Sequence, residues 1–239
     1  MIESGPQKPF ADLEKVPLHS EQEGKYVDLY ELKGDPNWVV KEQKDKVAWP
    51  TEYFERELEE TRRSLDLTRT HLGGALPETM LVVREADAEK NKYKNPRKIY
   101  FVQERIDGKS VYESDDAIVR DHIAELDRAL AGMVRAYMDS WSLKEGNTRK
   151  TGIMLDVHLK NLLIGRKRSA EKETEEQVWF VDVFPVMELQ CGTFLATLAD
   201  RIAGLADKGI DVTGPEFEKF HKARKDLDVL CGRETEGMR

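Results

Sequence analysis

The chain has 239 residues, enough to bury a sizeable core in one domain or in one domain with two lobes. Hydrophobic residues make up 39% and charged residues 35%, which indicates a soluble globular protein, and the net charge of -8 argues against an electrostatic grip on nucleic acid. No apolar run approaches the roughly 20 residues that span a bilayer. The start, MIESGPQKPF, lacks the apolar core of a secretion signal. We therefore expect a cytoplasmic protein with no membrane partner.

Two cysteines, Cys191 and Cys231, are the candidates for redox or metal chemistry. They lie in separate segments with helical periodicity, and neither belongs to a CxxC pair. We therefore predict two reduced thiols, with neither a disulfide bond nor a metal site.

Short apolar runs dominate the first 106 residues. KYVDLYEL (25 to 32) alternates apolar and polar residues, KGDPN (33 to 37) supplies turn residues, and WVVK (38 to 41) is a second apolar run, a pattern typical of a β-hairpin. ETMLVVRE (78 to 85) and KIYFVQERI (98 to 106) predict two further strands joined by a charged loop. We expect a small five-stranded antiparallel sheet that is complete by residue 106.

One helix is inserted in this sheet, and further helices follow it. Residues 51 to 72 form an amphipathic pattern that ends at Gly73 and Gly74. Its apolar side carries Phe54, Leu58, Thr61, Leu65 and Leu72. A long helix is predicted over residues 117 to 141, with an apolar side made by Val119, Ile123, Leu126, Leu130, Met133, Tyr137 and Trp141.

The remaining segments combine one hairpin with two helices. LLI (162 to 164) and VWFV (178 to 181) predict paired strands around a charged insert. Helical patterns follow at about 187 to 207 and 215 to 230. The order predicts an α+β fold of two domains, a β-rich lobe over residues 1–106 and a helical lobe over residues 107–239.

An apolar stretch, GIMLDVHLKNLLIG, contains three polar side chains within six positions: Asp156, His158 and Asn161. Two interpretations compete. The segment is either a polar turn between two apolar runs or a catalytic loop in which the acid, the histidine and the amide have separate roles.

Four motifs in chain order resemble the protein-kinase-like superfamily, in particular its compact atypical branches, the aminoglycoside and choline phosphotransferases and the RIO kinases. WVVKEQ resembles the strand with the phosphate-contacting lysine, and EYFERELEE the helix that carries its glutamate partner. FVQERIDGKSV resembles the strand and hinge that hold adenine, and DVHLKN followed by FVDVFP resembles the catalytic and metal-binding loops. The resemblance implies a two-lobed kinase-like fold with a reduced helical lobe.

This resemblance implies ATP and Mg²⁺ as cofactors and a hydroxyl acceptor in a small molecule or protein. Catalysis of phosphoryl transfer is mostly positioning and charge neutralisation. Asp156 would accept or orient the hydroxyl proton, Asn161 and Asp182 would hold the metal through oxygen atoms, and His158 would brace the loop among the catalytic residues. The nucleotide-binding residues would be Lys41 and its partner Glu57, with Glu60 as second choice, together with Gly24, Glu104 and Ile106.

Three functions remain open at the level of sequence. The first is an active phosphotransferase, which the joint presence of Lys41, Asp156, Asn161 and Asp182 favours. The second is a pseudokinase, a binding or scaffold module without turnover. It is favoured by the stretch LHSEQEGKY, whose single glycine is a poor match to a phosphate-covering loop. The third is an interaction protein with no nucleotide site.

Overall fold

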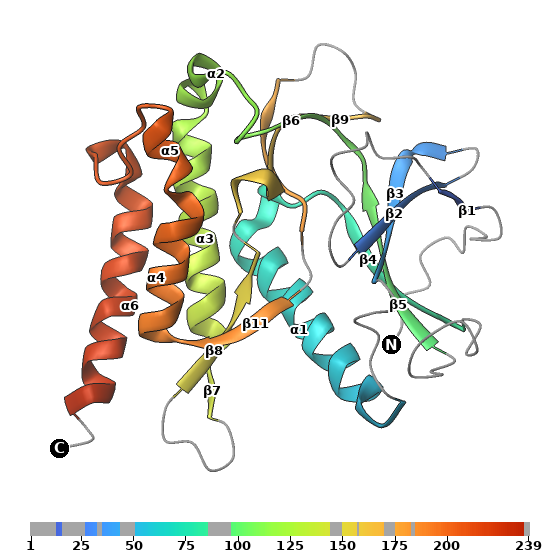
Figure 1. Cartoon of the computed structure of the whole chain (residues 1–239), viewed down its shortest axis with the longest axis horizontal. Helices are drawn as coiled ribbons and strands as arrows, with labels where there is room; N and C mark the ends of the chain where they lie inside the picture. Colours follow the sequence, from blue (N-terminus) through green and yellow to red (C-terminus); the bar gives the residue numbers. More distant parts are fainter. Residues whose placement is uncertain are drawn as a thin grey trace. The chain divides into compact units, whose positions relative to one another are not determined.

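The chain has an α+β fold that contains antiparallel sheets and helices, as the sequence predicts (Figure 1). The computed structural model describes residues 13–15, 27–32, 35–43, 51–85, 97–143, 150–156, 158–169, 175–182 and 185–236. Two compact units are present, which we call the sheet unit (Met1–Leu58, Glu78–Arg105 and Lys167–Ser169) and the helical unit (Glu59–Pro77, Ile106–Arg166 and Ala170–Arg239). The predicted division into domains at residue 106 stays a prediction about independent folding.

The sheet unit contains a five-stranded antiparallel sheet with the strand order β1-β2-β3-β5-β4, which confirms the predicted sheet. Its strands are β1 (Leu13–Lys15), β2 (Val27–Leu32), β3 (Asp35–Gln43), β4 (Thr79–Glu85) and β5 (Arg97–Glu104). The predicted turn at residues 33–37 is wrong in part. Leu32 pairs with Asp35, so residues 35–37 already belong to β3, and the polar residues there extend the strand instead of ending it.

The two faces of this sheet carry different clusters, because neighbouring side chains of a strand point to opposite faces. One face holds Val40, Tyr100 and Val102 in a common cluster. On the other face Ile99 packs with Phe54 and Leu58, which begin the helix α1 (Phe54–Leu72). The start of α1 therefore covers one face of the sheet.

Helix α1 confirms the predicted amphipathic segment. All five residues of the predicted apolar side are buried, and Gly73 follows the helix with a φ of 47°, a conformation that glycine adopts easily. Residues 59–72 of α1 belong to the helical unit, where Gly132 of α3 (Ile123–Asp139) approaches the backbone of His71.

The predicted long helix is two helices, α2 (Asp116–Asp121) and α3, which is a correction. In an unbroken helix the backbone N–H of His122 would donate to the carbonyl of Ile118. The His122 ring Nδ1 donates to that carbonyl instead, at 2.8 Å, and the backbone N–H donates to Val119. The side chain thus competes with the helical hydrogen bond and interrupts the helix.

Two small antiparallel sheets are formed by strands from residue 106 onward. The first has the order β10-β9-β6 and contains β6 (Ile106–Ser110), β9 (Leu162–Lys167) and β10 (Gln177–Phe180), so the predicted hairpin of β9 and β10 is confirmed. The second has the order β11-β8-β7 and contains β7 (Ser142–Leu143), β8 (Lys150–Leu155) and β11 (Pro185–Gln190). The predicted helix start at 187 is wrong, since β11 pairs with β8 there.

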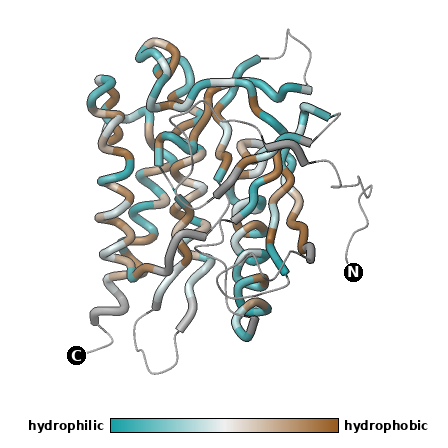
Figure 2. The backbone as a smooth tube through the Cα atoms, turned by 45° about the vertical axis from the view of Figure 1, so that its right-hand side comes forward, coloured by the Kyte–Doolittle hydropathy of each residue, from teal (hydrophilic) through white to brown (hydrophobic). Residues whose placement is uncertain are grey.

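Helices α4 (Cys191–Ile202), α5 (Gly204–Asp207) and α6 (Glu218–Glu236) complete the helical unit. Apolar and polar residues alternate along these helices (Figure 2). Helix α6 packs mainly on α3. Its first turn is capped by Asp127 of α3, a carboxylate only 4% exposed that accepts from the backbone N–H groups of Lys219 and Phe220 at 3.2 and 2.7 Å.

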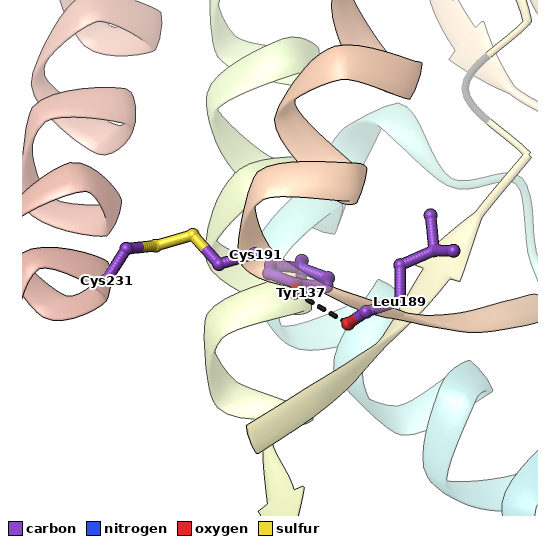
Figure 3. The surroundings of a disulfide bond; sticks show 4 residues. All are labelled: Tyr137, Leu189, Cys191 and Cys231. Carbon is purple, nitrogen blue, oxygen red and sulfur yellow. Dashed lines mark hydrogen bonds between the residues drawn. A yellow bond between two sulfur atoms is a disulfide. The ribbon is translucent and has the colours of Figure 1, made fainter. Parts of the chain in front are cut away.

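The prediction of two reduced thiols is wrong, because Cys191 of α4 and Cys231 of α6 form a disulfide bond with their Cα atoms 6.2 Å apart (Figure 3). Beside it, Tyr137 donates to the carbonyl of Leu189 at 2.8 Å. The two cysteines lie 40 residues apart, and only the packing of α4 and α6 brings them together. The predicted cytoplasmic location stays a prediction, and a disulfide bond weighs against it. No helix among the described residues has the length and apolar character to cross a membrane.

Candidate functional site

A tightly hydrogen-bonded loop joins β8 to β9 and contains Asp156, His158 and Asn161. The Asn161 side-chain amide donates to the carbonyl of Asp156 at 2.9 Å, and its backbone N–H donates to the carbonyl of His158 at 2.7 Å. Nδ1 of His158 accepts from the backbone N–H of Lys160 at 3.2 Å and caps the short 3-10 turn Leu159–Asn161. The loop is therefore ordered by its own side chains, which hold Asp156 and Asn161 beside each other.

Asp182 reaches the same place through the β9–β10 hairpin. Leu162 pairs with Phe180, and one residue further on the backbone N–H of Val181 donates to the carbonyl of Asn161 at 3.0 Å. Asp182 directly follows Val181. The structure therefore brings Asp156, Asn161 and Asp182 to one end of one hairpin within the helical unit.

The carboxylate of Asp156 is held without strong partners. Its Oδ1 is buried and makes no hydrogen bond among the described residues, although the side chain as a whole is 27% exposed. Nη1 of Arg201 in α4 lies 3.6 Å from Oδ1, which is longer than a hydrogen bond. A buried oxygen without a donor is costly, and such an atom indicates a position where a water, an ion or a ligand group binds.

His158 sits in an environment that disfavours its charged form. Burial lowers the pKa of His158 below 6.5, and the nearby Arg201 lowers it further, while Asp156 opposes the shift. The neutral ring is also the form whose Nδ1 can accept the hydrogen bond from Lys160. This geometry gives His158 a bracing role in the loop.

The donor set at the hairpin end consists of oxygen atoms. Two carboxylates and one side-chain amide are the ligands that suit a hard cation such as Mg²⁺, which keeps several water ligands and needs few from the protein. No group of three His, Cys, Asp or Glu side chains arranged for a metal ion occurs in the part of the chain that the structure describes. The residues fit a metal held jointly with a phosphate ligand, and they do not form a metal cage by themselves.

Lys41 and Glu57 lie on the same face of the five-stranded sheet. Lys41 of β3 is paired with Phe101, which shares its face with Ile99, and the start of α1 covers that face. Glu57 lies in this start of α1. Lys41 and Glu57 are each 8% exposed, so two opposite charges are buried on one side of the sheet unit.

The predicted hinge residues have structural roles of their own. The Glu104 carboxylate accepts from the backbone N–H of Glu78 at 3.0 Å and pairs with Lys167 at 2.6 Å, and the Glu104 N–H donates to the carbonyl of Glu78. Ile106 begins β6. Adenine binding by this segment stays a prediction. Gly24, the predicted glycine of the phosphate loop, lies outside the described residues.

Arg201 is the site residue that sequence reasoning missed. It lies 45 positions after Asp156, on the polar side of an amphipathic helix, and a charged residue there is indistinguishable from an ordinary solvated one. Only the packing of α4 beside the β8–β9 loop brings its guanidinium to 3.6 Å from the aspartate.

Comparison with known proteins adds little to this geometry. No protein-family model matches the chain, and no curated protein matches its sequence. Among solved structures, the chain is similar to the aminoglycoside phosphotransferase APH(3'')-Id from Streptomyces rimosus, with a TM-score of 0.42 and 12% sequence identity over 94% of this chain and 87% of that one. A similarity of this degree does not assign a function to the chain.

Proposed function

We propose that this protein is a kinase-like phosphotransferase that uses ATP and Mg²⁺ to phosphorylate a hydroxyl group of a small molecule or a protein partner. One observation carries the proposal. Asp156, Asn161 and Asp182 meet at one end of the β9–β10 hairpin, and Oδ1 of Asp156 is buried there without a hydrogen-bond donor. This is the arrangement that a loop of the form Asp-x-His-x-x-Asn, followed by a second aspartate, needs for phosphoryl transfer.

Asp156 acts in this proposal as the base that receives the hydroxyl proton. The acceptor oxygen forms a bond to the terminal phosphorus of ATP, the bond from that phosphorus to the bridging oxygen breaks, and ADP leaves with the electron pair. The proton of the hydroxyl moves to the Asp156 carboxylate. The bond from Asn161 to the backbone of Asp156 keeps the carboxylate in position during the transfer.

Asn161 and Asp182 are the oxygen ligands for the metal. Mg²⁺, when bound with the nucleotide, supplies positive charge that neutralises the phosphate oxygens. In the sheet unit, Lys41 has the phosphate-contacting role and Glu57 holds its ammonium group. A buried charge is costly unless it is paired, and the shared burial of Lys41 and Glu57 supports this pairing.

A pseudokinase is the second candidate, and two observations favour it. Arg201 lies 3.6 Å from Asp156, where it competes with a substrate for the carboxylate. The stretch LHSEQEGKY contains one glycine and two glutamates, which suit triphosphate binding poorly. Such a module would bind a nucleotide or a partner without turnover.

Thermal unfolding with ATP, with and without Mg²⁺, tests nucleotide binding first. At a concentration one hundred times the dissociation constant, a ligand that binds only the folded state adds about 2.7 kcal/mol to stability. We expect a rise in melting temperature with ATP and Mg²⁺ together and a smaller rise with ATP alone. No rise under either condition would support the interaction protein without a nucleotide site.

Release of phosphate or ADP from ATP then tests catalysis. Asp156→Asn should lower turnover by about 10² to 10⁴, the effect of losing a positioned general base, while ATP binding changes little. Asp182→Asn should weaken the Mg²⁺-dependent part of binding as well. Asp121→Asn, at an exposed position that ends α2, is the matched control. A parent protein that binds ATP but never releases phosphate would favour the pseudokinase.

A further inference from the structure

A cavity of 480 Å³ lies between α4, α5 and the beginning of α6, within the helical unit. Four buried apolar side chains line it: Leu198, Ile202, Ile210 and Phe220. Its volume falls in the range of sites for small molecules, roughly 300–1,000 Å³. None of the residues to which we assign phosphotransfer lines this cavity, so it is a separate feature of the molecule.

Small side chains leave space beside α4, α5 and the start of α6. Helix α6 packs mainly on α3, and small residues of α4 and α5, including Ala199 and Ala206, face the cavity. The disulfide bond between Cys191 and Cys231 connects the first residue of α4 to the C-terminal half of α6 (Figure 3). The covalent bond therefore restrains the two helices that lie on either side of the cavity.

Two charged residues, Asp211 and Arg224, lie at the rim of the cavity, and they differ in their hydrogen-bond partners. Asp211 already has partners, because its Oδ1 accepts from the backbone N–H and the hydroxyl of Thr213 at 2.8 and 2.7 Å. The Thr213 hydrogen bonds also lower the pKa of the Asp211 carboxyl. Arg224 is exposed and makes no ion pair or hydrogen bond with any described residue. The cavity therefore offers an apolar floor and one available cation.

We propose that this cavity is a binding site for a small amphipathic organic acid. The apolar body of the ligand lies on Leu198, Ile202 and Phe220, and its carboxylate or sulfonate meets the guanidinium of Arg224. A single cation with an aspartate nearby does not suit a polyanion such as a nucleotide, because each additional phosphate would need a further positive partner. The apolar floor excludes a purely polar ligand, since no group there would replace the hydrogen bonds of the ligand with water.

Two fluorescent probes of similar shape separate the apolar and ionic parts of this site. Anilinonaphthalenesulfonate carries one anionic group, and phenylnaphthylamine is its uncharged analogue. We expect saturable binding of both to the folded, disulfide-bonded protein with one site per chain. Arg224→Gln should weaken the sulfonate about fivefold, the value of roughly 1 kcal/mol for an exposed ion pair, and leave the uncharged probe unchanged.

A cavity-filling change tests the floor. Ala199→Phe should weaken both probes by about tenfold or more, because the added ring occupies the volume that they need. The matched controls are Ala196→Phe, an exposed position of α4 away from the cavity, and Lys225→Gln, an exposed charge next to Arg224 on α6. Neither control should change the affinity of either probe. Circular dichroism should show the same helix content in all four variants as in the parent protein.

Several results would overturn the proposal. Binding of the probes that does not saturate, or that Ala196→Phe weakens as much as Ala199→Phe, would mean non-specific adsorption to apolar surface. An equal loss of affinity for both probes in Arg224→Gln would show that Arg224 makes no ionic contact with the sulfonate. A dimer in sedimentation that Ala199→Phe dissociates would mean that a second copy of the chain covers the cavity.

Discussion

Two pairs of helices in the helical unit are held together by opposite means. Helices α1 and α3 approach so closely that a Cβ atom on Gly132 would lie 2.6 Å from the backbone oxygen of His71. Arg63 also donates to the carbonyl of Ser140 at 2.9 Å across this contact. Helices α4 and α6 instead leave a cavity of 480 Å³ and are joined by a disulfide bond.

The difference shows what each contact permits. A close contact between backbones tolerates almost no added volume, because protein interiors are packed as densely as crystals. Helices α4 and α6 are joined by a disulfide bond and leave a cavity beside them, and that space is available to a ligand. We therefore expect α1 and α3 to be sensitive to a single methyl group, and α4 and α6 to be sensitive to reduction.

The largest effect should follow loss of the disulfide bond. The two cysteines lie 40 residues apart, and closing a loop of that length removes enough entropy from the unfolded chain to stabilise the fold by about 4 kcal/mol. The double variant Cys191→Ser/Cys231→Ser should lower the free energy of unfolding by up to that amount in urea titration. The parent protein in reductant should behave as the double variant does. Equal urea midpoints for the parent and the double variant would show that the disulfide bond does not stabilise the fold.

The close contact should respond to one methyl group. Gly132→Ala places a Cβ against the backbone of α1, which cannot rotate away, and overpacking of this kind costs about 1–3 kcal/mol. Gly232→Ala is the matched control, because among the described residues no atom outside the local backbone of α6 lies within 4 Å of its added Cβ. That change should stabilise the protein by up to about 1 kcal/mol through helix propensity. Similar melting temperatures for the two variants would show that the α1–α3 contact can relax.

The smallest effect should come from the charges where α4 meets the β8–β9 loop. Because burial and Arg201 lower the folded pKa of His158 below 6.5, the unfolded chain binds the proton more readily, and stability is lost as the pH falls below 6.5. His158→Asn keeps a side-chain acceptor for the Lys160 N–H without titrating. Its melting temperature should therefore fall less between pH 7.5 and about 5.5 than that of the parent. An equal fall in both proteins would assign the pH dependence to other groups.

Local patterns were sufficient for the elements that depend on neighbouring residues. The five-residue apolar side of α1 and the hairpin of β9 and β10 follow from helical spacing and alternation, and both are present. The break at His122 and the strand β11 were missed. Each depends on a competing partner, the Ile118 carbonyl for His122 and the strand β8 for β11, that periodicity does not show.

The sequence by itself determined the elements with a clear local pattern, such as α1 and the β9–β10 hairpin, and the close grouping of Asp156 with Asn161, because six residues in one loop cannot separate far. It also connected Asp182 to them, since a hairpin returns the chain to its own start. Only the tertiary structure decided that Arg201 approaches Asp156, that Cys191 bonds Cys231, and that a cavity with Arg224 at its rim opens between α4 and α6. These contacts join residues far apart in the chain, and whole helices must pack before such residues meet, so no local pattern encodes them.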